Sequence, residues 1–138
     1  MNTTEQNKAI VTRFNKEFLE GGNIDVLYEL VSPDFINHTA APGMNNGREG
    51  MIRFLQHILK AAFPDLTVEI HDQLAEGNKV TTRKSFHATH TGPLMGIPAT
   101  RKKIRLDVID IVTLRDGQYV EHWGMSNMHS LLEELAGK

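Results

Sequence analysis

The chain has 138 residues, of which 40% are hydrophobic, and it contains no cysteine. This length and composition suit a single domain, residues 1–138, and the absence of cysteine excludes a disulfide framework, a thiolate nucleophile and cysteine-ligated metals. Lys and Arg number 15 against 17 Asp and Glu, for a net charge of -2, so no basic field favours nucleic acid or anionic lipid as a partner. No apolar run reaches the roughly 18 residues that span a bilayer, and the polar start lacks a secretory signal, so we expect no membrane partner and a cytoplasmic location.

Three helices are predicted in the first half of the chain. Apolar residues recur at helical spacing from Ile10 to Leu19, and Gly21-Gly22 ends this first helix. A short second helix, Val26–Val31, is predicted to stop at Ser32-Pro33-Asp34. The third helix covers Arg48–Phe63, behind a Pro- and Gly-rich loop that we interpret as a rim.

From Leu66 onward the apolar period changes to two, which predicts strands. The predicted strands are residues 66–71, 80–90, 104–114 and 119–125, with turns at 76–78 and 115–117 and a short amphipathic tail after them. Helices followed by strands indicate an α+β fold. We expect the N-terminal helices to pack on a curved antiparallel sheet and to enclose one pocket for a small molecule.

The third predicted strand places a carboxylate, Asp110, in an otherwise apolar stripe. Burying a carboxylate without partners costs several kcal/mol, so Asp110 implies a hydrogen-bond partner, a wet pocket or a raised pKa. If Arg115–Gly117 form a three-residue hairpin loop, Asp110 faces His122, whereas a slip in turn type brings Trp123 opposite it. The pair is a candidate for general acid–base catalysis, and a buried structural pair is the alternative.

Seven histidines raise the question of a metal site. His87 and His90, the closest pair, lie three residues apart in a strand and point to opposite faces, so we expect no metal. His38 is a candidate for the pocket mouth, with a surface-loop histidine as the alternative. Residues 91–100 are too apolar for an ordinary loop, and substrate contact through Met95, plugging of the core and dimer contact would each explain that composition.

The opposite face of the last predicted hairpin is also apolar. Ile109 and Ile111 are expected there together with Tyr119, Trp123 and Met125. Because the helices cover only one face of the sheet, we expect a homodimer through the other face. Cover by the C-terminal tail is the alternative.

Three segments carry a resemblance to a known family: Phe63–Leu66, His90–Thr100 and Arg115–Trp123. They resemble the SnoaL-like polyketide cyclases and the broader ester cyclase group, over nearly the whole chain. The resemblance implies the cone-shaped α+β barrel of the nuclear transport factor two-like superfamily, shared with ketosteroid isomerases and scytalone dehydratase. Characterised cyclases of this family close a ring by intramolecular aldol addition of a polyketide methyl ester, with an Asp as general acid and base and no cofactor.

The resemblance matches some of the family's site residues to this chain and leaves others without a match. The catalytic Asp of the family aligns with Gly124, so the principal carboxylate is absent from its usual position. Two pocket histidines of the family align with Asp110 and His122. The second histidine is retained in this chain, and the first is replaced by the carboxylate. Asn37 and His90 also match pocket positions of the family.

The sequence therefore predicts a cofactor-independent cyclase or isomerase that acts on a small hydrophobic carbonyl compound through enolate chemistry. Asp110 is the predicted base, and His122 is its orienting partner or the proton donor. Phe14, Phe18 and the loop 93–98 are predicted to form the apolar walls.

Two other functions are weighed against this one, because one fold serves many functions. A non-catalytic carrier or sensor of an apolar ligand could use the same pocket, and Gly124 favours it. An epoxide hydrolase-like activity requires an Asp-Arg-Asp arrangement that is not evident, since Ser85 follows two residues after Arg83.

Overall fold

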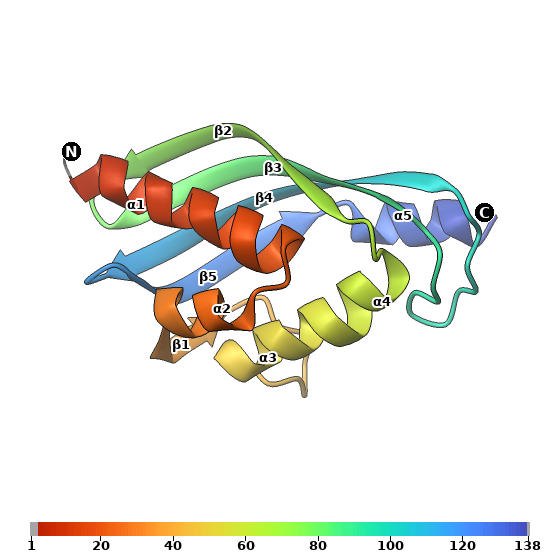
Figure 1. Cartoon of the computed structure of the whole chain (residues 1–138), viewed down its shortest axis with the longest axis horizontal. Coiled ribbons are helices and arrows are strands. Elements are labelled where there is room, and N and C mark those ends of the chain that lie inside the picture. Colours follow the sequence, from red (N-terminus) through yellow and green to blue (C-terminus); the bar gives the residue numbers. More distant parts are fainter. Residues whose placement is uncertain (1–2, 138) are drawn as a thin grey trace.

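The structure is a computed structural model that describes residues 3–137, and it places the N-terminal helices on one face of a curved sheet (Figure 1). The elements are α1 (Thr3–Arg13), η1 (Phe14–Glu20), α2 (Ile24–Leu30), β1 (Val31–Asn37), α3 (Arg48–Arg53), η2 (Phe54–Leu59), α4 (Lys60–Ala62), β2 (Thr67–Glu76), β3 (Lys79–Thr89), β4 (Lys103–Arg115), β5 (Gln118–Ser126) and α5 (Met128–Leu135). The π-helical segments η1 and η2 continue α1 and α3 directly. The predicted first and third helices are thus confirmed.

The sheet has the strand order β1-β5-β4-β3-β2 and is open, with β1 and β2 at its edges. Neighbouring strands in the sheet are antiparallel, except for β1 and β5, which run parallel to each other. The predicted α+β class is confirmed, and the four predicted strands, β2 to β5, pair antiparallel; β1, which was not predicted as a strand, adds the parallel pair. Ser32-Pro33-Asp34, predicted only to stop the second helix, lies within β1. An edge strand tolerates Pro33, and the β1–β5 register shifts between Val31 and Ile36 around it.

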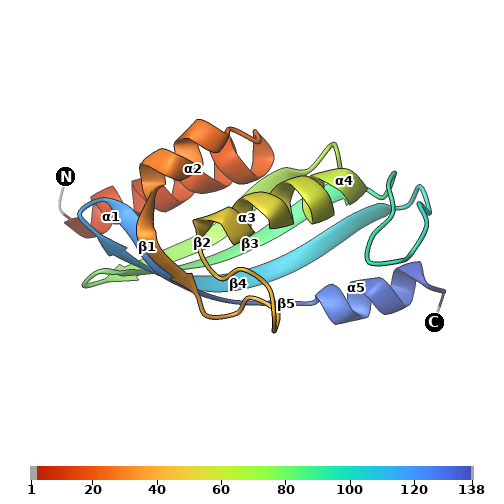
Figure 2. The same ribbon diagram turned by 90° about the horizontal axis from the view of Figure 1, so that it is seen from below.

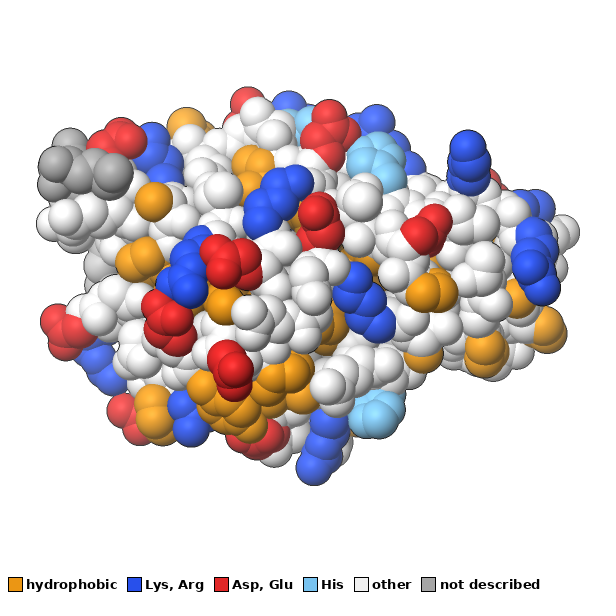
Figure 3. All heavy atoms as spheres, in the orientation of Figure 1, with side chains coloured by type: hydrophobic (Ala, Val, Ile, Leu, Met, Phe, Trp, Pro, Cys, Tyr) orange, Lys and Arg blue, Asp and Glu red, His pale blue; other side chains and the backbone are white. Residues whose placement is uncertain are grey.

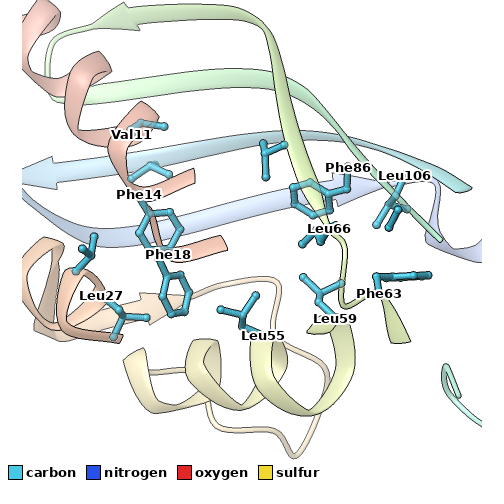
Figure 4. Packing of buried hydrophobic residues seen from close by; sticks show 14 of the residues in the cluster. Val11, Phe14, Phe18, Leu27, Leu55, Leu59, Phe63, Leu66, Phe86 and Leu106 are labelled. Atoms are coloured by element: carbon cyan, nitrogen blue, oxygen red, sulfur yellow. The ribbon is translucent and has the colours of Figure 1, made fainter. Parts of the chain in front are cut away.

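The hydrophobic core lies between the helices and the concave face of the sheet. Figures 2 and 4 show α2, α3 and α4 on one side of the sheet and the apolar side chains that they bury against it. Phe14 and Phe18 of η1 are 3% and 0% exposed, with ring centroids 5.1 Å apart. Each fully buried side chain of this kind contributes about 1.5–3 kcal/mol to folding. The two predicted wall residues are therefore part of the tightly packed core.

The strands alternate between a buried concave face and an exposed outer face, as the period of two requires. On β4 the even-numbered residues point inward, and Ile109 and Ile111 point outward with 52% and 38% of their surface exposed. Met125 of β5 is 81% exposed on the same outer face. The C-terminal helix α5 leaves these side chains exposed, so the tail does not cover them.

Tyr119 lies on the concave face, and its predicted outer position is wrong. Thr113 pairs with Glu121, but Leu114 pairs with Tyr119, so Val120 is an extra residue on β5. This β-bulge reverses the alternation between the two ends of the strand. Tyr119 is 1% exposed, and its ring lies 4.5 Å from that of Phe14.

Acidic and basic side chains are interspersed on the helix-covered side of the molecule, in agreement with the near-zero net charge (Figure 3). Within residues 3–137, the helices are too short or too polar to cross a membrane. A cytoplasmic location and the absence of a nucleic acid partner remain predictions.

Candidate active site

Five polar side chains form a continuous hydrogen-bonded chain on the concave face, here called the polar chain: Asn15, Lys84, Asp110, His122 and Asn37. Lys84 Nζ donates to Asn15 Oδ1 at 2.7 Å and to Asp110 Oδ2 at 3.1 Å. His122 Nε2 lies 3.3 Å from the same carboxylate oxygen, and His122 Nδ1 lies 2.9 Å from Asn37 Oδ1. The predicted pair Asp110 and His122 and the predicted pocket residue Asn37 are therefore brought together by the fold.

The register of the last hairpin differs from the predicted one. Asp110 pairs directly with Gly124, and His122 pairs with Val112, so the predicted pairing of Asp110 opposite His122 is wrong. The turn has two residues, Asp116 and Gly117, both with positive φ, which suits a type I′ hairpin. The bulge then moves β5 by one residue and returns His122 to the concave face, diagonally next to Asp110.

Asn37 fixes the orientation of the His122 ring. The backbone N–H and the hydroxyl of Thr39 both donate to Asn37 Oδ1, at 3.1 and 3.0 Å, so this atom is the carbonyl oxygen of the amide. An acceptor thus faces His122 Nδ1, and a carboxylate faces His122 Nε2. The doubly protonated imidazolium can donate to both.

Asp110 is 6% exposed and titrates unlike an isolated buried carboxyl group. Burial alone would raise its pKa, but the charge of Lys84 and hydrogen bonds from His122 and Lys84 bring the pKa of Asp110 below its ordinary value. Asp110 is consequently an ionised carboxylate at neutral pH and a weak base. Burial, together with the charge of Asp110, raises the pKa of Tyr119.

The lowered pKa of Asp110 predicts an acid-sensitive fold. A carboxylate whose pKa is depressed by folding stabilises the native state above its ordinary pKa of about 3.9, and this contribution disappears as pH falls through the folded pKa. We expect the thermal midpoint to fall steeply below about pH 4, and the slope to be shallower in Asp110→Asn than in wild type. Thermal unfolding between pH 2 and 7, with the exposed carboxylate variant Asp34→Asn as control, measures this. Equal slopes in wild type and Asp110→Asn would contradict it.

Sequence reasoning missed two members of the polar chain, Asn15 of η1 and, with the clearer signal, Lys84 of β3. Lys84 is 2% exposed and also lies 5.5 Å from the ring centroid of Phe86. The signal was present: on β3 the inward residues Val80, Thr82, Phe86 and Ala88 are uncharged, and Lys84 places a charge among them as Asp110 does on β4. A buried charge requires a partner of opposite sign, so the lysine in the stripe of β3 and the aspartate in the stripe of β4 are expected to pair with each other.

Other predicted site residues lie away from the polar chain. His38 Nε2 is 3.0 Å from Glu121 Oε2, and the His38 ring stacks on Trp123 with centroids 4.6 Å apart. Because Glu121 and Trp123 point to the outer face, His38 does not line the concave side.

His90 and Met95 belong to the loop between β3 and β4, near the start of β4. Lys103, the first residue of β4, comes seven residues before Asp110, which corresponds to roughly 23 Å along the strand. His90 is fully buried, its Nδ1 accepts from the Thr100 backbone N–H, and its Nε2 has no hydrogen-bond partner within residues 3–137. Met95 is 54% exposed at the tip of the loop.

The two most distinct hollows lie outside the concave face. One, of about 360 Å³, is on the outer face and is lined by residues such as Asp107, Ile109 and Met125. The other, of about 330 Å³, lies by the start of β4, next to Thr67 and His87. The enclosed pocket remains a prediction. Within residues 3–137, no group of three or more His, Asp or Glu side chains is arranged to hold a metal ion.

Comparison with known proteins places this geometry in a family. The family described as SnoaL-like polyketide cyclase matches residues 9–135. The chain belongs to that family. Its predicted membership and its nuclear transport factor two-like α+β fold are thereby confirmed, although the sheet is curved and open rather than a closed barrel.

Solved structures of the family are similar over almost the whole chain. IdmH from Streptomyces antibioticus, provisionally named a polyketide cyclase, is 30% identical with a TM-score of 0.83, over 96% of this chain and 99% of that one. A Bacillus cereus protein with the same provisional name is 30% identical with a TM-score of 0.82, over 95% and 80% of the two chains. TsrD from Streptomyces laurentii, 23% identical over 100% of both chains with a TM-score of 0.86, is similar in fold. No curated protein sequence matches.

Proposed function

We propose that this protein is a cofactor-independent cyclase or isomerase that acts on a small hydrophobic carbonyl compound by general acid–base chemistry. The observation that carries the proposal is the contact of 3.3 Å between His122 Nε2 and Asp110 Oδ2. This pair lies on the concave face of a chain whose family is that of the SnoaL-like polyketide cyclases. Positioned His and carboxylate groups transfer protons at rates that matter for catalysis.

The electrostatics of the pair favour roles that differ from those predicted from the sequence. Asp110, with its lowered pKa, is too weak a base to remove a proton from carbon efficiently. We therefore assign the proton transfer to His122 Nε2, and Asp110 stabilises the imidazolium that forms. Lys84 holds Asp110 in its ionised form.

In an aldol cyclisation, one proton leaves the substrate and is later returned to it. His122 in its neutral form, with its proton on Nδ1 toward Asn37 Oδ1, turns the free Nε2 from Asp110 toward the substrate, takes a proton from the carbon next to a carbonyl group and leaves an enolate. The enolate carbon forms a bond to a second carbonyl carbon, whose π electrons move to its oxygen. That alkoxide then takes the proton back from Nε2–H, so no oxidant, reductant or metal is required.

Exposure of the polar chain indicates where a substrate would approach. Asn15, Lys84 and Asp110 are buried, whereas the His122 side chain is 18% exposed. Gly124, next to it, is also partly exposed. The His122 end is therefore the part of the polar chain that a carbonyl compound can reach.

A ligand screen separates the enzyme from the alternative of a non-catalytic carrier, which Gly124 favours. Aromatic polyketide methyl esters, cyclic enones and lactones would be tested by thermal shift and by chromatography of the product. An enzyme predicts that a ligand raises the melting temperature of wild type and Asp110→Asn and that wild type alone converts it. Stabilisation of both proteins without conversion by either supports the carrier.

We also propose that the protein forms a homodimer through the outer face of the sheet. The exposed apolar residues Ile109, Ile111 and Met125 support this, because contiguous apolar surface is rare on monomers. Sedimentation equilibrium is expected to give a dimer for wild type and a monomer for the double variant Ile109→Asp/Met125→Asp. Met95→Asp, which changes an exposed residue elsewhere, is the control. A monomeric wild type would contradict the proposal.

A further inference from the structure

The imidazole of His122 occupies the space above Gly124. A β-carbon built on Gly124 would lie 2.9 Å from His122 Cε1 and 3.2 Å from His122 Nε2. It would also lie 3.6 Å from Asp110 Cβ. The first distance is shorter than real β-carbons tolerate, so any side chain at position 124 requires the ring to move.

The backbone gives no reason for a glycine at this position. Gly77, Gly96 and Gly117 have positive φ angles, but Gly124 does not, and other residues can adopt its conformation. Glycine within a strand is destabilising relative to a residue with a side chain. The close approach of the His122 ring is the feature that requires glycine here.

The ring must cross Gly124 to reach Asp110. Gly124 is the direct partner of Asp110 across β4 and β5, and His122 is the diagonal neighbour. Diagonal neighbours have α-carbons about 7–8 Å apart, so the side chain has to lean across position 124 to bring Nε2 within 3.3 Å of the carboxylate.

The backbone of Gly124 belongs to the same hydrogen-bonded unit. Its N–H donates to Thr39 Oγ1 at 3.2 Å, and the Thr39 hydroxyl donates to Asn37 Oδ1. Asn37 Oδ1 faces His122 Nδ1. Asn37 thus orients one edge of the ring, and the missing side chain of Gly124 lets the other edge reach Asp110.

We propose that Gly124 is a positioning residue, whose lack of a side chain sets the contact between His122 Nε2 and Asp110. This inference rests on the proposed function, because the contact places the proton-transferring atom beside the carboxylate. A side chain at position 124 and the observed His122 ring position exclude one another. The protein therefore carries its acid–base step on an imidazole that lies where a residue-124 side chain would otherwise project.

The variant Gly124→Ala tests the proposal through the titration of Asp110. The hydrogen bond from His122 is one of the causes that lower the pKa of Asp110. Displacement of the ring removes that hydrogen bond, so the pKa of Asp110, followed by the ¹³C shift of its carboxyl group, is expected to rise in Gly124→Ala. We expect kcat/KM to fall by roughly 10-fold or more, as loss of a well-oriented catalytic group requires.

The matched control is Gly124→Ala in a protein that lacks the His122 ring. In a His122→Ala background, the added methyl group has no imidazole to displace, so Gly124→Ala is expected to leave the Asp110 titration unchanged. An unchanged titration in the single variant, or an equal shift in both backgrounds, overturns the proposal. A shift confined to the background with His122 supports it. If wild type converts no ligand and the shift is still seen, the positioning role stands and the proposed function fails.

Discussion

Lys84→Met is expected to lower the free energy of unfolding by about 3–5 kcal/mol, because it leaves the Asp110 carboxylate buried without its cation. Lys84 and Asp110 are 2% and 6% exposed, and the distance between Nζ and Oδ2 is 3.1 Å. Methionine is one atom shorter than lysine but keeps most of its apolar stem, so the change removes chiefly the charged amine and its hydrogen bonds to Asp110 and Asn15. Urea unfolding at pH 7 measures the effect.

Two further variants show whether the loss comes from the buried ion pair. Lys103→Met removes an exposed lysine at the start of β4 and is expected to change stability by no more than about 0.5 kcal/mol. The double variant Lys84→Met/Asp110→Leu removes both charges and should recover most of the loss. If Lys84→Met costs no more than Lys103→Met, the carboxylate is not held by Lys84.

His122→Gln is expected to lower kcat/KM by roughly 10²–10⁴-fold on any carbonyl compound that wild type converts, as removal of a general acid–base group does. Glutamine can still donate to one of the two acceptors, Asn37 Oδ1 or Asp110 Oδ2, so most of the stability and the ligand affinity should persist. Initial rates and binding titrations on the same ligand measure the two effects separately.

The control for this variant is His129→Gln on α5. The His129 side chain is 88% exposed and contacts Glu133, far from any role in the polar chain. We expect its turnover to match that of wild type. Equal turnover in His122→Gln and His129→Gln would show that His122 does not transfer the proton.

The sequence was informative about the site wherever a polar residue broke a regular apolar pattern. Asp110 in the stripe of β4 signalled a buried carboxylate, and its contact with His122 was anticipated. The strand register that produces this contact was not anticipated, because a two-residue turn combined with a bulge at Val120 has no clear local signature. Either of these two features alone would have turned His122 away from the concave face. Lys84 carried the same signal as Asp110 and could have been found.

Long-range pairing accounts for the remaining differences in the fold. Residues 31–37 contain Pro33, which argues against a central strand but permits an edge strand. Only the parallel contact with β5 makes this segment a strand. His38 shows the same limit, because its outward direction depends on Glu121 and Trp123, more than eighty residues later.

The most direct test of proton transfer by His122 is hydrogen–deuterium exchange at the carbon next to the carbonyl group of a bound ligand. Wild type, His122→Gln and His129→Gln would be incubated in D₂O with an aromatic polyketide methyl ester that raises the melting temperature, and deuterium incorporation would be followed by mass spectrometry. We predict incorporation with wild type and His129→Gln, and only the uncatalysed background with His122→Gln. Incorporation at the same rate with all three proteins, or background alone with wild type, would contradict the assignment of His122 as the acid–base residue.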